Sequence, residues 1–154
     1  MSALLKVDVR SVDSAEEAVR EAETVVTATS TREPVLRGDW LAPGAHINAI
    51  GANRAQAREL DDDAVIRSAF VCVDSIEQAR MEAGDLISPI ERGLLSWARV
   101  RELGEVVAGK VVGRANHHDV TLFKSVGIAL EDVAVGAWVY ERAREHKVGK
   151  EVSL

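Results

Sequence analysis

Two segments combine a predicted strand with a following loop of small residues, an arrangement that can seat a flat ligand against the backbone. Thr27-Ala28-Thr29-Ser30 ends a β-branched run that starts at Thr24, and Ala49-Ile50-Gly51-Ala52-Asn53 ends a run that starts at His46. Gly51 permits a tight turn that leaves backbone groups accessible. Because ligands of open parallel sheets bind at the carboxyl ends of strands, both loops are candidate binding loops. The alternative is that both are ordinary strand exits.

A third candidate segment is Lys124-Ser125-Val126-Gly127. The surrounding apolar pattern predicts one long helix over about residues 120–145, with Lys124 in its first turn. The helix dipole disfavours a cation at that end, so the lysine is expected to have an anionic partner in the protein or in a ligand.

The other polar clusters are interpreted as structural. His117-His118-Asp119 is expected to be a surface loop, because adjacent side chains do not converge on one metal ion. Asp61-Asp62-Asp63 is expected to begin a helix rather than to bind magnesium. Glu82 and Asp85 are expected in a solvated turn at a helix end. Cys72, the single cysteine, lies in an apolar run and is predicted to be a buried structural thiol, with neither a disulfide nor a cysteine metal cluster.

The composition limits the class of protein. The chain has 154 residues, of which 47% are hydrophobic and 29% are charged, as in a folded globular domain. The net charge of -6 argues against a nucleic-acid partner, which would need a basic face. No apolar run reaches transmembrane length, and the first residues do not resemble a signal peptide, so we expect a cytoplasmic protein without a membrane partner.

The elements that position the candidate loops alternate along the chain. Short strands are predicted at about residues 4–9, 24–29, 46–51 and 69–73. Helices are predicted from Ser14 and from Ser75, where capping boxes occur, and over about residues 59–67, 88–97, 102–110 and 120–145. This alternation is typical of a parallel sheet with helical crossovers, and it predicts an α/β fold. The last helix is apolar around most of its girth, so another domain or another chain is expected to cover it.

The phosphate loop of dinucleotide folds has no counterpart in these residues. A G-x-G-x-x-G loop would normally follow the first strand, and the nearest glycine pairs, Gly104/Gly109 and Gly109/Gly113, have the wrong spacing. There is also no Walker loop. A nucleotide would therefore bind without its main anchor, or the anchor lies outside this chain.

Several segments nevertheless resemble one known family, in order and at matching spacing over essentially the whole chain. They are VVTATS at 25–30, PGAHINAIGA at 43–52, RELD at 58–61, VDS at 73–75, EAGD at 82–85, ELGEV at 102–106 with Gly109, and TLFKSVG at 121–127 with Glu131 and Asp132. The chain resembles the ornithine cyclodeaminase/mu-crystallin family. The resemblance implies a Rossmann-type domain that binds NAD or NADP. It also implies chemistry on amino acids or cyclic imines: ornithine cyclodeamination, reduction of ketimines or pyrroline-2-carboxylate, or alanine dehydrogenation.

The resemblance also implies which residues contact the cofactor. Residues 27–29 would lie beside its adenosine-ribose and pyrophosphate side, 50–53 would approach the nicotinamide, and 124–127 would close over it from the long helix. The implied cofactor-binding residues are Thr27, Ala28, Thr29, Ile50, Gly51, Asn53, Lys124, Ser125, Val126 and Gly127.

Asn53 departs from the family pattern, because ornithine cyclodeaminases have a catalytic aspartate at this position. An asparagine amide is not a general base at neutral pH. We therefore expect ketimine or pyrroline-2-carboxylate reduction rather than ornithine cyclodeamination, and no residue of this chain is assigned a catalytic role. The carboxylate-binding arginine, the catalytic lysine and the residue that selects NAD or NADP belong to parts of the family pattern that have no counterpart here.

The resemblance predicts an incomplete Rossmann-type parallel sheet with flanking helices in one domain. Its partial nucleotide-binding portion would span about residues 1–85, with a helical segment at about 86–154. Such a truncated chain is expected to be inactive alone, and the alternative is a non-catalytic remnant that oligomerises without cofactor. In either case we expect a homo-oligomer, formed through the long helix or through an open edge strand near Val7.

Overall fold

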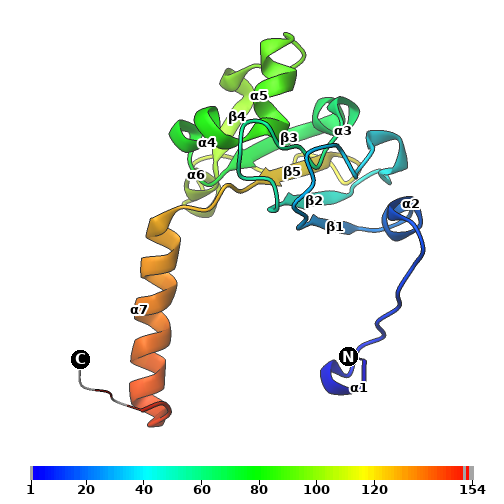
Figure 1. Cartoon of the computed structure of the whole chain (residues 1–154). Coiled ribbons are helices and arrows are strands. Elements are labelled where there is room, and N and C mark those ends of the chain that lie inside the picture. The colour runs from blue at the N-terminus through cyan, green and yellow to red at the C-terminus, as the bar shows by residue number, and fades with distance from the viewer. Residues whose placement is uncertain (1, 151, 153–154) are drawn as a thin grey trace.

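The computed structural model describes residues 2–150 and 152, and its centre is a five-stranded sheet in which all neighbouring strands are parallel (Figure 1). The strand order is β1-β2-β5-β3-β4, so the last strand of the chain lies in the middle of the sheet. The predicted α/β class is confirmed. The strands are β1 Thr24–Thr27, β2 His46–Ala49, β3 Ser68–Val73, β4 Val100–Glu102 and β5 Val120–Lys124.

Short helices connect the strands, and a long helix, α7, projects away from the sheet (Figure 1). Three predicted helix starts are confirmed, because the side chains of Ser14, Asp61 and Ser75 each accept a hydrogen bond from a first-turn backbone N–H. The α-helices are α1 Ser2–Leu5, α2 Ala15–Val19, α3 Asp62–Arg67, α4 Ile76–Glu82, α5 Gly84–Glu91, α6 Leu103–Val107 and α7 Ala129–His146, and the 3-10 helices are η1 Gly38–Trp40 and η2 Trp97–Arg99.

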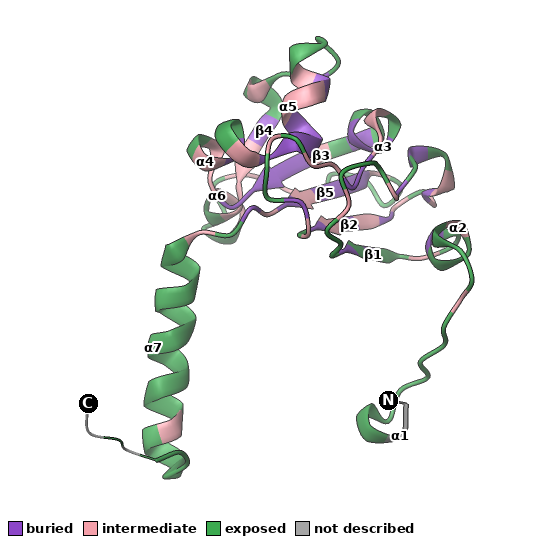
Figure 2. Ribbon diagram, in the orientation of Figure 1, coloured by how far each residue is buried: buried purple, intermediate pink, exposed green. Residues whose placement is uncertain are grey.

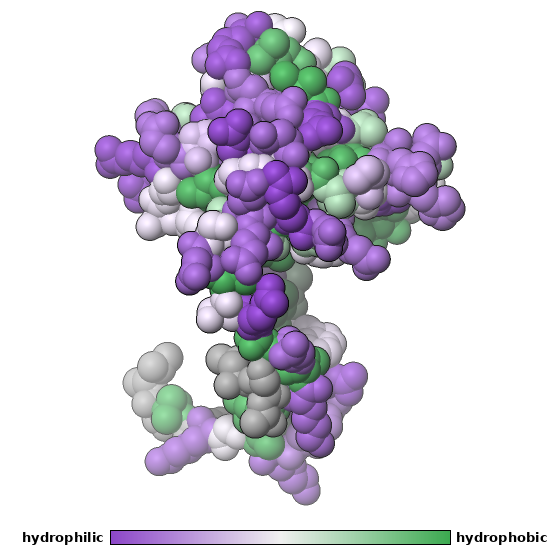
Figure 3. Space-filling view, turned by 90° about the vertical axis from the view of Figure 1, so that its right-hand side faces the viewer, coloured by the Kyte–Doolittle hydropathy of each residue, from purple (hydrophilic) through white to green (hydrophobic). Residues whose placement is uncertain are grey.

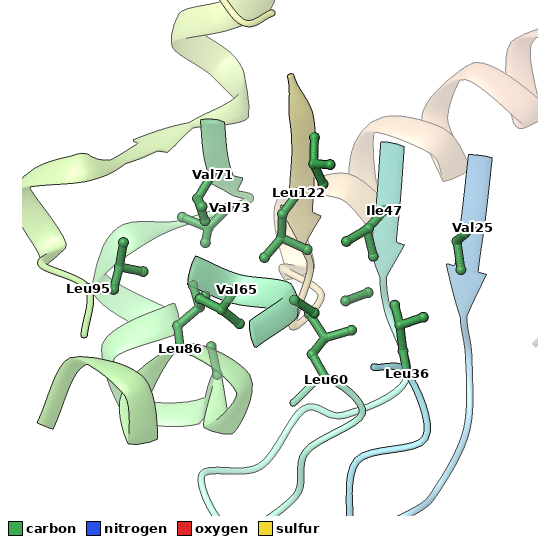
Figure 4. Close-up of a cluster of buried hydrophobic side chains, with 14 of the residues drawn as sticks. Val25, Leu36, Ile47, Leu60, Val65, Val71, Val73, Leu86, Leu95 and Leu122 are labelled. Atoms are coloured by element: carbon green, nitrogen blue, oxygen red, sulfur yellow. The ribbon is translucent and has the colours of Figure 1, made fainter. Parts of the chain in front are cut away.

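The hydrophobic core lies between one face of the sheet and the helices α3 and α5. Ile47 and Leu122 are fully buried in neighbouring strands and point toward Val65 and Leu86 (Figure 4). Burying one such side chain stabilises the fold by about 1.5–3 kcal/mol. The opposite face of the sheet is more open, and Val26 on β1 is 58% exposed there (Figure 2).

The long helix predicted over about residues 120–145 is wrong at its start. Residues Val120–Lys124 form the central strand β5, and α7 begins only at Ala129. A strand buried on both faces is a continuous apolar run, which in sequence merges with the apolar residues of the helix that follows.

The expected burial of the long helix is not observed within the described chain. Every residue of α7 is exposed except Ala143, which is half-buried, and Figure 2 shows the exposed helix below the body. Figure 3 shows the molecule from the side, with apolar groups among the polar ones on its narrow lower part. The large exposed apolar side chains of α7 are Leu130, Val133, Val135, Trp138, Val139 and Tyr140.

Two further predictions are corrected. Residues 4–9 do not form a strand: α1 ends at Leu5, and the segment that follows has no neighbouring strand to pair with. The edge strands of the sheet are therefore β1 and β4, and neither lies near Val7. The helix predicted over 88–97 starts earlier and ends at Glu91, because the chain turns at Gly93, whose φ is +73°.

No helix of the described chain is long and apolar enough to cross a membrane.

Candidate functional site

The loops after β1 and β2 lie side by side and line a groove. Thr27 and Ala49 are partners in the parallel register, so the two strands end at the same edge of the sheet. The groove has a volume of about 610 Å³, within the range of small-molecule sites. The residues that line it are Ala28, Thr29, Ser30, Thr31, Arg32, Ile50, Gly51, Ala52, Asn53, Arg54 and Ala57.

One buried carboxylate, that of Glu59, holds both loops. Its oxygens accept hydrogen bonds from the backbone N and Oγ1 of Thr29, at 2.6 and 2.8 Å, and from Thr27 Oγ1 at 3.0 Å. They also accept from the backbone N of Gly51 at 2.8 Å and of Ala52 at 3.1 Å. Glu59 is 0% exposed. The Glu59 side chain therefore fixes the position of the two loops relative to each other.

The charge of Glu59 is maintained by these donors. Burial by itself raises the pKa of the carboxyl group, because it penalises the ionised form. The hydrogen bonds from Thr29, Gly51 and Ala52 act in the opposite direction and prevail, so the pKa of Glu59 is lowered from its usual value of 4.5. Glu59 is therefore an ionised acceptor at neutral pH.

A buried ion pair supports this carboxylate from behind. Asp85 Oδ1 accepts hydrogen bonds from the backbone N of Glu59 at 2.7 Å and of Leu60 at 2.9 Å. Its Oδ2 lies 3.2 Å from Lys124 Nζ, and both side chains are 0% exposed. The predicted solvated turn at Asp85 is wrong, because the residue lies in the first turn of α5 and faces the interior.

The expected anionic partner of Lys124 is Asp85, although the lysine ends strand β5 rather than beginning a helix. Lys124 Nζ also donates to the carbonyl oxygen of Ala49, at 3.2 Å, and to that of Ala52. Ala52 is thus held at its N–H by Glu59 and at its carbonyl by Lys124. The lysine shapes the β2 loop from inside the protein and does not line the groove.

Glycine is required at position 51 by close packing. A Cβ at Gly51 would lie 2.3 Å from Thr29 N and 2.4 Å from both Thr29 O and Glu59 Oε1. These distances are well inside van der Waals contact, and two of the three atoms belong to the backbone. Only a residue without a side chain lets the two loops meet above Glu59.

The third candidate segment is held by another carboxylate and does not line the groove. Asp74, at the end of β3, accepts hydrogen bonds at its Oδ2 from Ser125 Oγ at 2.8 Å, Val126 N at 2.9 Å and Gly127 N at 2.8 Å. The structure therefore brings Ala28, Thr29, Ile50, Gly51 and Asn53 together around one groove, with Thr27 buried beneath it. Lys124 ends β5, and residues 125–127 follow it at the same carboxyl ends of the strands, where the backbone N of Ser125 donates to the carbonyl oxygen of Ala49 at 3.0 Å.

Sequence reasoning missed Glu59, Asp85, Arg32 and Arg54 as site residues. An acidic residue in a polar loop is normally solvated, and nothing in the spacing of these two acids indicates burial. A signal existed only for the lysine, whose apolar surroundings implied an anionic partner. The prediction for Cys72 is confirmed, because the thiol is buried and burial raises its pKa to about 11.

Comparison with known proteins gives consistent results. Residues 1–147 match the model of the ornithine cyclodeaminase/mu-crystallin family. The ketimine reductase mu-crystallin of Mus musculus is 45% identical over 135 residues, which are 87% of this chain and 40% of that protein.

Solved structures of similar proteins carry a nicotinamide cofactor. The Delta(1)-pyrroline-2-carboxylate reductase of Thermococcus litoralis, in complex with NADH and L-proline, superimposes with a TM-score of 0.90 at 42% identity, covering 98% of this chain and 47% of that one. An archaeal alanine dehydrogenase dimer with bound NAD gives a TM-score of 0.83 at 36% identity, covering 99% and 47%. The chain thus spans less than half the length of the relatives that it matches.

Proposed function

The chain belongs to the ornithine cyclodeaminase/mu-crystallin family, and we propose that it forms part of an NAD(P)-dependent enzyme that acts on amino acids or cyclic imines. The observation that carries the proposal is the groove at the carboxyl ends of β1 and β2. Its lining includes Ala28, Thr29, Ile50, Gly51 and Asn53, five of the residues that the family resemblance assigns to the cofactor. A nicotinamide cofactor bound there would supply or accept a hydride.

The local geometry fits a flat, close-lying group. The absence of a side chain at Gly51 lets the two loops that line the groove pack closely together, and the ionised Glu59 holds them in one arrangement. Asp74 holds residues 125–127 in the same manner at the neighbouring strand end, where they are proposed to close over the cofactor. The role proposed for Lys124 is to position the β2 loop, because its side chain is buried.

We further propose reduction of a ketimine or of pyrroline-2-carboxylate in preference to ornithine cyclodeamination. Asn53 is exposed and lines the groove, and its amide cannot take up a proton as a carboxylate would. Similar proteins include a ketimine reductase and a pyrroline-2-carboxylate reductase, which favours an enzyme over the non-catalytic alternative.

The relatives are more than twice as long as this chain, which supports the proposal that the chain supplies only one part of the enzyme. Because β4 and the central strand β5 lie after residue 85, we propose that the chain through β5 supplies part of a Rossmann domain and that α7 supplies its helical extension. The G-x-G-x-x-G loop and the substrate domain would come from the additional segment that the relatives carry, and the chain alone would be inactive.

We also propose that the chain associates with a second copy through α7 or through the open edge at β1. The exposed apolar side chains of α7 support this proposal, as does the dimer of the similar alanine dehydrogenase. Sedimentation analysis of the wild type and of Trp138→Glu tests it. A single sedimenting species at the mass of one chain, unchanged over the concentration range, would contradict the proposal.

The cofactor proposal is tested by titrating the chain with NADH and NADPH and following cofactor fluorescence and thermal shift. We expect weak, saturable binding of at least one of them, because the phosphate loop is not part of this chain. No binding at millimolar cofactor would contradict a cofactor site in this groove.

Substrate preference is tested in a chimera that joins the remaining half of the Thermococcus litoralis reductase to this chain. We expect oxidation of NADH by pyrroline-2-carboxylate and no turnover of ornithine with NAD+. Turnover of ornithine in place of the imine would contradict the proposed reaction.

A further inference from the structure

Two arginines face the groove without any partner in the described chain. Arg32 follows the β1 loop and Arg54 follows the β2 loop, and both line the groove. Neither side chain makes an ion pair or hydrogen bond with residues 2–150 or 152. By contrast, Arg58 and Arg92 both pair with Asp62. Two unpaired cations on one groove give it positive charge, which favours an anionic ligand there.

The buried acids beneath the groove do not neutralise these arginines. The Glu59 carboxylate accepts five hydrogen bonds from the two loops and is 0% exposed. Asp85 is likewise 0% exposed and is paired with Lys124. Both carboxylates therefore belong to the interior, and the positive charge at the surface of the groove is left for a ligand.

Three backbone donors of the same loops are also engaged. Phosphate sites in nucleotide folds commonly use backbone N–H groups that point at the ligand. Here the N–H groups of Thr29, Gly51 and Ala52 all donate inward to Glu59. These three N–H groups are therefore not directed at a ligand, and the guanidinium groups are the charged donors that line the groove.

The backbone that carries Arg54 is fixed in place. A Cβ at Gly84, the first residue of α5, would lie 2.3 Å from Ala57 O, 2.7 Å from Ala55 O and 2.9 Å from Arg54 O, so residues 54–57 pack directly on this helix start. A guanidinium on a fixed base loses less freedom when it binds a ligand than one on a mobile loop.

We propose that Arg32 and Arg54 form an oxyanion-binding subsite of the groove. The proposal rests on the proposed function, in which the ligands of this groove carry such groups. A guanidinium binds two oxygens of a phosphate or a carboxylate through parallel hydrogen bonds, and both chemistries occur in these ligands. The source is the phosphate of the nicotinamide dinucleotide or the carboxylate of the amino or imino acid.

Calorimetric titration with two probes tests the subsite and separates its sources. Inorganic pyrophosphate stands for the dinucleotide and L-proline for the carboxylate, and each is titrated into the wild type, Arg32→Gln, Arg54→Gln and the double variant. Loss of one charge-assisted hydrogen-bonding group is expected to weaken the relevant probe roughly tenfold, and the double variant more. The control is Arg99→Gln, which removes the same charge from an exposed position in η2, beside β4 at the opposite edge of the sheet from the groove.

The source is identified by the probe that binds more weakly to the arginine variants than to the wild type and binds the control with unchanged affinity. The subsite is overturned if the wild type binds neither probe, or if the double variant binds both as the wild type does. NADH is titrated in parallel. If the affinity for L-proline is also unchanged, equal NADH affinity in the wild type and the double variant overturns the subsite and leaves the cofactor site standing. If the double variant loses affinity for a probe while the wild type does not bind NADH, the subsite stands and the cofactor site is contradicted.

Discussion

Lys124 Nζ and Asp85 Oδ2 lie 3.2 Å apart in the interior, and neither side chain is exposed to solvent. The pair joins the last residue of β5 to the first turn of α5, and it has hydrogen bonds to the β2 loop on one side and to the backbone of Glu59 on the other. Burying two charges is costly, so the pair stabilises the fold only while both partners are present.

Substitution Lys124→Met is therefore expected to lower the free energy of unfolding by about 3–5 kcal/mol, because it leaves the Asp85 carboxylate buried and uncompensated. Urea unfolding measures the loss. The matched control is Arg142→Met, which breaks the exposed pair with Glu145 on α7 and should change stability by about 0–1 kcal/mol. Equal losses of unfolding free energy for the two substitutions would show that the buried pair contributes no more to stability than the exposed pair.

The lowered pKa of Glu59 predicts a pH dependence of stability. A group whose folded pKa lies below its unfolded value contributes stability that is complete above the unfolded value and is lost as the pH falls through the folded pKa. For Glu59 the loss begins near its usual value of 4.5 and continues below it. Urea midpoints measured from about pH 7 down to pH 3 should fall less steeply for Glu59→Gln than for the wild type. Parallel curves would contradict the assignment.

Gly51→Ala is expected to disturb the groove, because the added Cβ would overlap the backbone of Thr29. Overpacking of this kind typically costs about 1–3 kcal/mol. Cofactor affinity should fall with it if the groove is the binding site. The control is Gly104→Ala in α6, where nothing lies within 4 Å of the new Cβ. Alanine is favoured over glycine in a helix by about 0.5–1 kcal/mol, so the control should be neutral or stabilising. Unchanged unfolding and binding in Gly51→Ala would remove the steric argument.

Cys72 is expected to resist thiol reagents in the folded protein. Its pKa is raised to about 11 by burial, and the residue is 5% exposed, so both the thiolate fraction and access are small. The measurement is the rate of alkylation at mildly alkaline pH with and without urea. Rapid labelling of the native chain would mean that the sheet face opposite α3 and α5 readily exposes the Cys72 thiol to solvent.

Much of the architecture was predictable from local signals. The β-branched runs at Thr24 and His46 and the capping serines at positions 14 and 75 correspond to observed elements. The central strand β5, Val120–Lys124, was missed because its three apolar residues do not distinguish a short buried strand from the start of a buried helix. The end of the helix at Glu91 depended on a left-handed residue, Gly93, whose conformation the sequence permits and does not demand.

The site was predictable at its surface and not in its interior. Small residues after two strands indicated the groove, since small size and position at a strand end are visible in the sequence. The burial of Glu59 and Asp85 depends on residues far away in the chain, such as Thr29 and Lys124. Burial of this kind is a tertiary property, and local spacing does not encode it.

The position of β5 between β2 and β3 also bears on how the chain is made. The pairing of β2 with β5 joins residues as far apart as Ala49 and Lys124, 75 positions along the chain. Until β5 has been synthesised, β1-β2 and β3-β4 are two separate ribbons with open edges. Such distant pairing makes folding slow and leaves those edges exposed to other nascent chains. The sheet can therefore be completed only after the chain has been synthesised as far as β5, which ends at Lys124.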